Sequence, residues 1–109
     1  MTTLSLETRE EGEQVRVAVG GELDLSSALT FDEEMRRAEE LGPSTLILDL
    51  SRLKFLDSTG LRLILSAHSR AAKRGHRLAV VQGTEAVRRI FRLAGVTARL
   101  DIVEDLAGV

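Results

Sequence analysis

Cysteine, tryptophan and tyrosine are absent from this chain of 109 residues, and proline occurs once. The lack of cysteine excludes a disulfide framework, a thiol nucleophile and a thiolate metal site, and it fits a reducing, cytoplasmic location. The only aromatic side chains are three phenylalanines, too few for a surface that stacks nucleic-acid bases. No apolar run approaches the roughly 18 residues of a membrane-spanning helix, and the start does not resemble a signal peptide. We therefore expect a soluble protein with no direct nucleic-acid or membrane binding.

The composition predicts one compact domain over residues 1–109. Apolar residues make up 43% and charged residues 29% of the chain, as in ordinary globular domains, and the length suffices for one core but not for two. Residues 1–57 carry 6 basic and 13 acidic side chains, whereas residues 58–109 carry 9 and 4. Since no aromatic residues are interleaved, we interpret the basic clusters at 70–77 and 88–92 as solvated helix faces.

Apolar spacing divides the chain into strands and helices. Alternation in residues 4–8 and 14–20 predicts a β-hairpin, with Gly20-Gly21-Glu22-Leu23-Asp24 ending its second strand. The elements predicted after it are a helix from Ala28 to Gly42-Pro43, a buried strand at 46–50, a helix from Ser58 to about Gly75, a strand at 77–82, a helix from Thr84 to Gly95, a strand at 100–103 and a helical turn from Glu104. Phe31, Phe55 and Phe91 are predicted to lie in the core.

The order β-β-α-β-α-β-α-β, with a short last helix, predicts an α/β fold with a mostly parallel, mixed sheet whose antiparallel edge is the N-terminal hairpin. Functional residues of such sheets collect beyond the carboxyl ends of the strands. Asp24, Asp49 with Ser51, and the turn that contains Asp57 all follow predicted strand cores. We therefore expect these side chains to converge at one edge of the sheet.

The most informative stretch is Phe55-Leu56-Asp57-Ser58-Thr59-Gly60-Leu61, between the buried strand and the next helix. Asp57, Ser58 and Thr59 are all good N-cap residues, and Gly60-Leu61 permits close approach of another backbone. The turn places hydroxyl groups at a helix N-terminus, where a phosphate is well accommodated. Ser58 is therefore either a plain helix cap or a group that carries a phosphate.

Other chemistry at this turn is less favoured. A nucleophilic Ser58 needs a histidine base, but His68 lies about ten residues along the helix, roughly 15 Å away, and His76 precedes the next strand at its far end. Asp24, Asp49 and Asp57 suit Mg²⁺, which leaves a metal-dependent phosphotransfer protein as an alternative, although capping the adjacent helices is the ordinary role of such aspartates. No lysine ends a strand as a receiver domain would require. We predict no cofactor, no metal and no enzymatic activity.

Four motifs, in order along the chain, resemble those of STAS domains, and most closely those of bacterial anti-sigma factor antagonists. They are Gly21-Glu22-Leu23-Asp24, Leu48-Asp49-Leu50-Ser51, the stretch from Phe55 to Leu61, and Phe91-Arg92-Leu93-Ala94-Gly95-Val96. The stretch from Phe55 to Leu61 is similar to the family's phosphorylation loop, the most specific of the four. The likeness covers nearly the whole chain.

The resemblance implies a partner-switching protein. Its unphosphorylated form would bind an anti-sigma factor that is also a serine kinase of the histidine-kinase-like ATPase fold, and so release a sigma factor. Phosphorylation of Ser58, rather than Thr59, would switch binding off, and a metal-dependent serine phosphatase would reverse it. The loop implied to bind the partner comprises Asp24, Asp49, Ser51, Asp57, Thr59, Gly60 and Leu61.

Two departures from the family pattern have consequences. The sequence ends soon after Glu104, so the usual final helix is expected to be short or missing, which leaves a monomer or a weak homodimer as the expected state. Ser27 stands where many relatives have threonine, which keeps a hydroxyl. The alternative function within the family is a STAS subunit of a lipid-transport complex or a scaffold of a stress-sensing assembly.

Overall fold

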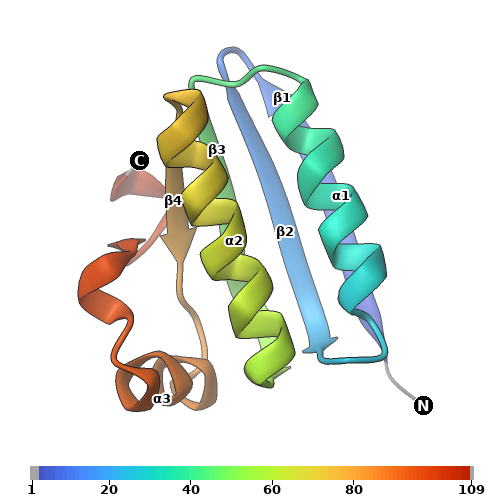
Figure 1. The fold of residues 1–109 in the computed structure, drawn as a ribbon, viewed down its shortest axis with the longest axis vertical. Helices are drawn as coiled ribbons and strands as arrows, with labels where there is room; N and C mark the ends of the chain where they lie inside the picture. Colours follow the sequence, from blue (N-terminus) through green and yellow to red (C-terminus); the bar gives the residue numbers. More distant parts are fainter. Residues whose placement is uncertain (1–2, 109) are drawn as a thin grey trace.

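The computed structural model describes residues 3–108 and confirms the predicted order of elements (Figure 1). The strands are β1 (Leu4–Glu11), β2 (Gln14–Leu23), β3 (Thr45–Leu56), β4 (Arg77–Val81) and β5 (Asp101–Val103). The helices are α1 (Ala28–Glu40), α2 (Ser58–Arg74) and α3 (Glu85–Ala94). Two short 3₁₀ helices, Thr97–Arg99 and Leu106–Gly108, flank β5, so the expected last helical turn is present as the second of them.

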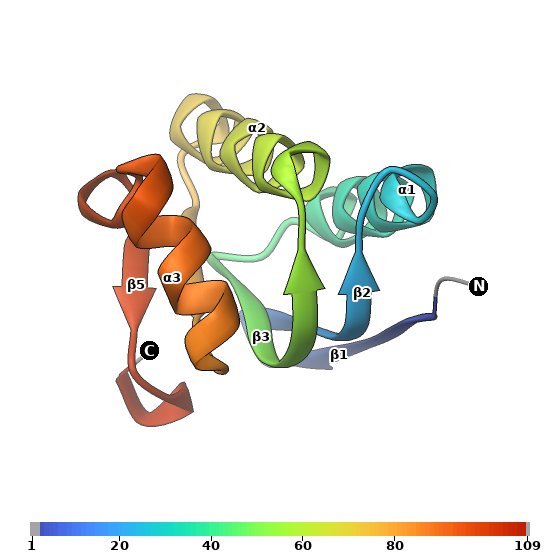
Figure 2. The same ribbon diagram turned by 90° about the horizontal axis from the view of Figure 1, so that it is seen from below.

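One mixed sheet with strand order β1-β2-β3-β4-β5 forms the centre of the domain. β1 pairs with β2 in antiparallel fashion, and all other neighbours are parallel, as the sequence predicts. Helices α1 and α2 lie side by side over one face of the sheet (Figure 2), and α3 packs against β3. The face of β1–β3 that turns away from α1 and α2 is left uncovered by helices.

The core lies between the sheet and these helices. Alternate residues of β2 and β3 point into it, and each helix contributes its apolar stripe. Its fully buried members include Val17, Val19, Leu46, Leu48, Leu50, Phe31, Met35, Ile64 and Phe91. Phe31 and Phe91 are thus core residues as predicted, whereas the prediction for Phe55 is wrong, since 48% of that residue is exposed.

β2 ends within the predicted stretch of residues 20–24, whereas β3 is longer than predicted. β2 continues through Gly20-Gly21 to Leu23, with shifts of register against β3 at these glycines. Gly21 adopts a φ of 81°, and a Cβ there would lie 2.2 Å from the carbonyl oxygen of Thr3. In both shifts the extra residue belongs to β3, so β3 carries the bulges, while Gly21 lets β1 approach β2 closely. Alongside it, β3 extends to Leu56 instead of ending near Leu50.

The part of β3 that extends beyond β4 is covered by the loop between β4 and α3. A Cβ on Gly83 would lie 2.4 Å from the Cα of Ser51, so the loop backbone lies directly on β3. The Thr84 hydroxyl donates to the carbonyl of Leu53 at 3.1 Å and accepts from the amide of Val87 at 3.3 Å. Thr84 therefore caps α3, as predicted, and also fixes it to β3.

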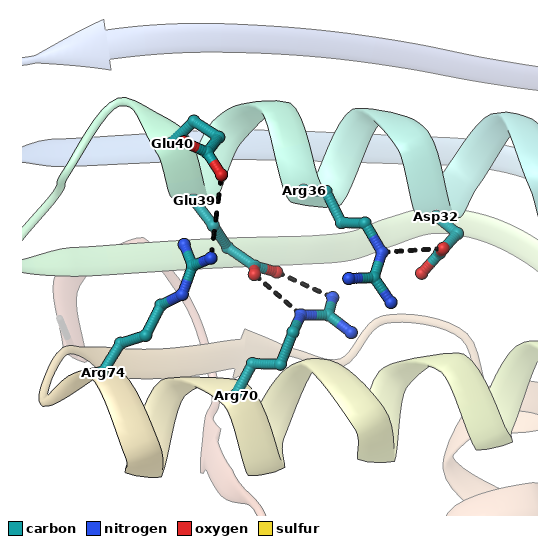
Figure 3. Close-up of polar contacts among 6 residues, drawn as sticks. All are labelled: Asp32, Arg36, Glu39, Glu40, Arg70 and Arg74. Atoms are coloured by element: carbon teal, nitrogen blue, oxygen red, sulfur yellow. Dashed lines mark hydrogen bonds and ion pairs between the residues drawn. The ribbon is translucent and has the colours of Figure 1, made fainter.

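A buried ion pair joins α1 to α2 (Figure 3). Arg70 donates from Nε and Nη2 to the two carboxylate oxygens of Glu39 at 2.7 and 2.8 Å, and Glu39 is only 4% exposed. The hydrogen bond to Glu39 raises the pKa of Arg70. Arg74 extends the contact to Glu40 at 3.7 Å. The interpretation of this basic cluster as a purely solvated face is therefore wrong for Arg70, which neutralises an acid that α1 buries.

Within residues 3–108, no helix is both long and apolar enough to cross a lipid bilayer.

Candidate functional site

Two turns lie next to each other at the carboxyl edge of the sheet. β2 and β3 remain paired up to Leu23 and Leu56, so the turn into α1 and the turn into α2 leave the sheet side by side. The Asp57 amide donates to the carbonyl of Leu23 at 3.2 Å, which fixes the second turn to the end of β2. The paired ends of β2 and β3 thus bring Asp24 and Asp57 together, as the sequence predicts for these two residues.

Asp57 connects the two turns. Its Oδ1 accepts from the amide of Gly60 at 2.9 Å, and its Oδ2 accepts from the amide of Leu25 at 3.1 Å. The extended backbone of Asp57 and the Gly60 contact make it the N-cap of α2. One carboxylate therefore closes the first turn of α2 and holds the start of the neighbouring turn.

Asp24 and Ser27 organise the turn into α1. Oδ1 of Asp24 accepts from the amide and the hydroxyl of Ser26 at 3.0 and 2.7 Å. The Ser27 side chain, nearly buried, accepts from the Asp24 amide at 3.0 Å and lies 3.1 Å from the carbonyl oxygen of Glu22, to which it donates. Asp57 thus caps α2 as predicted, but the capping role is wrong for Asp24, which binds the turn before α1, a helix whose N-cap is Ser27. The hydroxyl that Ser27 retains is used.

Ser58 is the first residue of α2 and is exposed. Its hydroxyl makes no hydrogen bond within residues 3–108. Because Asp57 fills the cap position, the alternative in which Ser58 is the helix cap is wrong. Thr59 beside it is half-buried, and Leu61 is 9% exposed. Of the two adjacent hydroxyl residues, Ser58 is therefore the more accessible.

Gly60 explains how α2 can begin so close to the sheet. A Cβ at this position would lie 2.7 Å from Cδ1 of Leu56, 2.8 Å from Cγ of Leu23 and 3.0 Å from the carbonyl oxygen of Leu23. The predicted close approach of another backbone is thus confirmed. The first turn of α2 lies directly on the ends of β2 and β3, which fixes the direction in which Ser58 is presented.

Apolar side chains that the sequence interpretation missed surround this turn. Leu25 is 76% exposed, Leu29 is 71% exposed and Phe55 is 48% exposed. Phe55 and Leu25, with Asp24, Ser26 and Asp57, line a shallow hollow of about 480 Å³. A signal was available for Leu29, because it lies outside the spacing of Ala28, Phe31 and Met35 that defines the buried stripe of α1.

Asp49 and Ser51 do not belong to this cluster, which corrects the predicted convergence. Asp49 pairs with Ala18 and Val81 in the middle of the sheet, because β3 ends only at Leu56. Its Oδ1 accepts from the Ser51 amide at 3.0 Å, and its Oδ2 lies 3.9 Å from Nε of Arg16. These residues therefore lie on the face of the sheet that helices leave uncovered.

The geometry does not support the two catalytic alternatives, a metal site at the aspartates and a nucleophilic Ser58. Asp24, Asp49 and Asp57 are not gathered into a metal-binding group, and no set of three or more candidate ligands occurs in residues 3–108. His68 lies well along α2, and His76 follows the end of that helix. Burial lowers the pKa of His76. Neither histidine is positioned to act as a base for Ser58.

These features define a class of protein: a single α/β domain with a mixed five-stranded sheet. An exposed serine begins the helix that follows the central strand. Residues 6–104 match the family described as "Mlab, STAS domain". The chain belongs to the STAS domain family, which confirms the predicted family.

Two similar proteins are named as anti-sigma factor antagonists. The chain is 34% identical over 80 residues to the anti-sigma-F factor antagonist RsfB of Mycobacterium tuberculosis, covering 73% of this chain but only 65% of RsfB. It is 24% identical to the anti-sigma-B factor antagonist of Staphylococcus aureus, covering 93% and 94% of the two chains.

Solved structures share the fold. An anti-sigma factor antagonist from Mycobacterium paratuberculosis superposes with a TM-score of 0.89 at 24% identity, covering 97% of this chain and 90% of the other. The Bacillus cell fate determinant SpoIIAA in its phosphorylated form gives a TM-score of 0.70 at 21% identity, covering 97% and 96%.

Proposed function

We propose that this protein is an anti-sigma factor antagonist whose binding is switched by phosphorylation of Ser58. In the proposed cycle the unphosphorylated form binds an anti-sigma factor that is also a serine kinase of the histidine-kinase-like ATPase fold, and a sigma factor is released. The names of the two relatives support the class. The observation that carries the site is the exposed Ser58 hydroxyl, which has no hydrogen-bond partner in residues 3–108 and begins a helix already capped by Asp57.

The chemistry is transfer of a phosphoryl group to this protein as substrate. The Ser58 oxygen attacks the γ-phosphorus of ATP, the bond to the β-phosphate oxygen breaks, ADP leaves, and the serine proton passes to a base of the kinase. A metal-dependent serine phosphatase then hydrolyses the ester. In this proposal the antagonist supplies the Ser58 hydroxyl and holds it at an exposed position, and it is a substrate rather than an enzyme. We propose that the cycle takes place in the cytoplasm.

The helix N-terminus makes the modified state compatible with the same fold. A phosphoserine carries about −1.5 to −2 charges at neutral pH, and the free amides and the dipole of α2 favour negative charge at its first turn. Since the unmodified hydroxyl bonds to nothing in residues 3–108, its modification breaks no internal contact. We therefore expect phosphorylation to change the surface and to leave the domain folded.

The exposed apolar residues give the partner a surface to bind. Phe55 near the end of β3 and Leu25 in the turn into α1 line one hollow with Asp57, the neighbour of Ser58, and Leu29 is exposed on the first turn of α1. Buried apolar area supplies most of the affinity of such contacts. A phosphate beside Asp24 and Asp57 would have to be desolvated in that interface. A loss of about 3 kcal/mol weakens binding more than 100-fold, which is enough to switch partners.

The test is to incubate the full chain with candidate ATPase-fold kinases and ATP and to locate the phosphate by mass spectrometry. We expect one phosphate on Ser58, none in Ser58→Ala, and unchanged modification in Thr59→Val. Phosphate on Thr59 would refute the assignment of the site. If no kinase adds a phosphate, and if Ser58→Asp leaves the affinity for the partner unchanged, the scaffold or lipid-transport alternative would be favoured.

A further inference from the structure

A second hollow lies on the sheet face that α1 and α2 leave uncovered. β2 carries two small residues there, and the registers place Ala18 between Glu7 of β1 and Asp49 of β3, and Gly20 between Ser5 and Arg52. The larger side chains of β1 and β3 therefore surround a bottom that is formed by Ala18 and Gly20 of β2. The result is a hollow of about 470 Å³ with a mostly polar lining, within the usual size range of small-molecule sites.

Three arginines gather at this hollow. Arg9 and Arg16 are directly opposite each other in the pairing of β1 with β2, and both line the hollow together with Arg52. Like charges directly opposite each other on neighbouring strands destabilise a sheet. Arg52 forms no ion pair with any residue in the described range 3–108. The three positive charges are therefore held close together by the fold.

The acidic residues of the hollow do not fully satisfy these arginines. Glu7 accepts from Arg9 at 2.8 Å, but Asp49 is 3.9 Å from Nε of Arg16, an ion pair beyond hydrogen-bond distance. Nε of Arg16 is buried and has no hydrogen-bond partner in residues 3–108. A buried donor without an acceptor costs free energy, and an arrangement with three guanidinium groups and two carboxylates leaves net positive charge.

We propose that this hollow binds the phosphate group of a small metabolite. A guanidinium binds an oxyanion through paired, charge-assisted hydrogen bonds, so a phosphate between Arg9 and Arg16 would relieve their repulsion. Within the described residues, Asp49, on the neighbouring strand, forms only the 3.9 Å ion pair with Arg16 and leaves its Nε free to donate to a ligand. The hydroxyl groups of Ser5 and Ser51 offer hydrogen bonds to the rest of the ligand. The site is independent of the proposed function, since it lies on the sheet face opposite α1 and α2 and does not include Ser58.

Inorganic phosphate is the probe for a first test. The ¹⁵N-labelled full chain is titrated with sodium phosphate and, separately, with sodium chloride at equal ionic strength, and amide shifts are followed by NMR. We expect saturable shifts with phosphate alone, largest around Ser5, Ala18, Gly20 and Ser51. Arg9→Gln and Arg16→Gln should each weaken phosphate binding by about tenfold or more, the loss expected for a charged hydrogen-bond partner.

Arg9→Gln decides the outcome if Arg16→Gln does not fold, because the Arg9 side chain is 63% exposed. Arg89→Gln removes the same charge from an exposed position of α3 and should bind phosphate as the unmodified chain does. Shifts that do not saturate, or that are equal in Arg9→Gln and Arg89→Gln, would overturn the proposal. Binding to phosphatidylglycerol vesicles without any response to free phosphate would overturn it too, in favour of a membrane surface.

Discussion

The turns that lead into α2 and α3 have the same construction but differ at the first residue of the helix. Asp57 and Thr84 both cap their own helix and both bond to a neighbouring segment, Asp57 to the Leu25 amide and Thr84 to the Leu53 carbonyl. Both helices end at a glycine with positive φ, Gly75 and Gly95. The fold therefore uses one kind of junction twice at the same edge of the sheet.

The residue after each cap is where they diverge. α3 begins with Glu85, a permanent negative charge paired with Arg92, whereas α2 begins with Ser58, which is neutral and makes no hydrogen bond within residues 3–108. Helix N-termini favour negative charge. At α3 the sequence supplies that charge with Glu85, and at α2 it leaves a neutral serine, where the proposed phosphorylation would add the charge and dephosphorylation would remove it. This difference is the physical basis for assigning the switch to α2.

The largest expected effect comes from adding a charge at the α2 junction. Ser58→Asp should weaken binding to the anti-sigma factor more than 100-fold, a change of about 3 kcal/mol, because the charge enters the proposed interface. Isothermal titration calorimetry measures the affinity, and circular dichroism should show an unchanged helical signal. Ser69→Asp, which adds a charge at an exposed position farther along α2, is the matched control and should bind normally. Equal weakening by both variants would contradict a local interface effect.

The next effect concerns the glycines that bring each junction onto the sheet. Gly83→Ala should destabilise the domain by about 2–3 kcal/mol and Gly60→Ala by about 1–2 kcal/mol, within the range for overpacking. The order follows from the neighbours: a Cβ at Gly83 would meet the backbone of Ser51 at 2.4 Å, whereas one at Gly60 meets first the tip of the Leu56 side chain at 2.7 Å. Urea denaturation measures both. A larger loss for Gly60→Ala would show that the α2 junction is the more rigid one.

These junctions also show what could be predicted from the sequence. The caps at Asp57 and Thr84 follow from local chemistry, because each bonds to an amide three residues along its own helix. The sequence also indicated a close approach at Gly60, but not that the approaching segment is Leu23 of β2. The predicted location of Asp49 was wrong because it depended on where β3 ends. The sequence pattern there, an apolar run followed by polar residues, does not show where the strand ends. β3 continues to Leu56 because β2 pairs with it through Gly20-Gly21 up to Leu23 and the loop at Gly83 packs on it. Those are contacts between distant segments.

Exposure of Phe55 escaped prediction for a related reason. A phenylalanine beside an apolar strand normally enters the core, and only the pairing of Glu22 with Phe55 at the edge of the sheet leaves it outside. The surface around Ser58 is thus a product of the register between β2 and β3. The serine itself could be found from its motif, but its apolar surroundings required the fold.

Removal of the caps should have a smaller effect than the glycine substitution at Gly83. Loss of an N-cap side chain costs about 0.5–2 kcal/mol. We expect a loss at the upper end of this range for Asp57→Ala, since it also frees the Leu25 amide, and a loss of about 1 kcal/mol for Thr84→Ala. Thermal and urea denaturation report the difference. Asp57→Asn, which keeps an acceptor for one amide, should fall between them. If Thr84→Ala lowered the stability more than Asp57→Ala, the hydrogen bond from Thr84 to Leu53 would contribute more than the two that Asp57 accepts from Gly60 and Leu25.

The smallest effect tests the permanent charge at α3. The hydrogen bond from Arg92 lowers the pKa of Glu85 below its ordinary 4.5, so its contribution to stability is present above that pH and is lost as the pH falls through the lowered value. Because Glu85 is exposed, Glu85→Gln should cost less than Asp57→Ala, and salt should reduce the cost further. Stability curves of both chains between acidic and neutral pH should converge at the acid end. A difference that persisted in acid would mean that Glu85 acts through packing, and its contrast with Ser58 would no longer be one of charge.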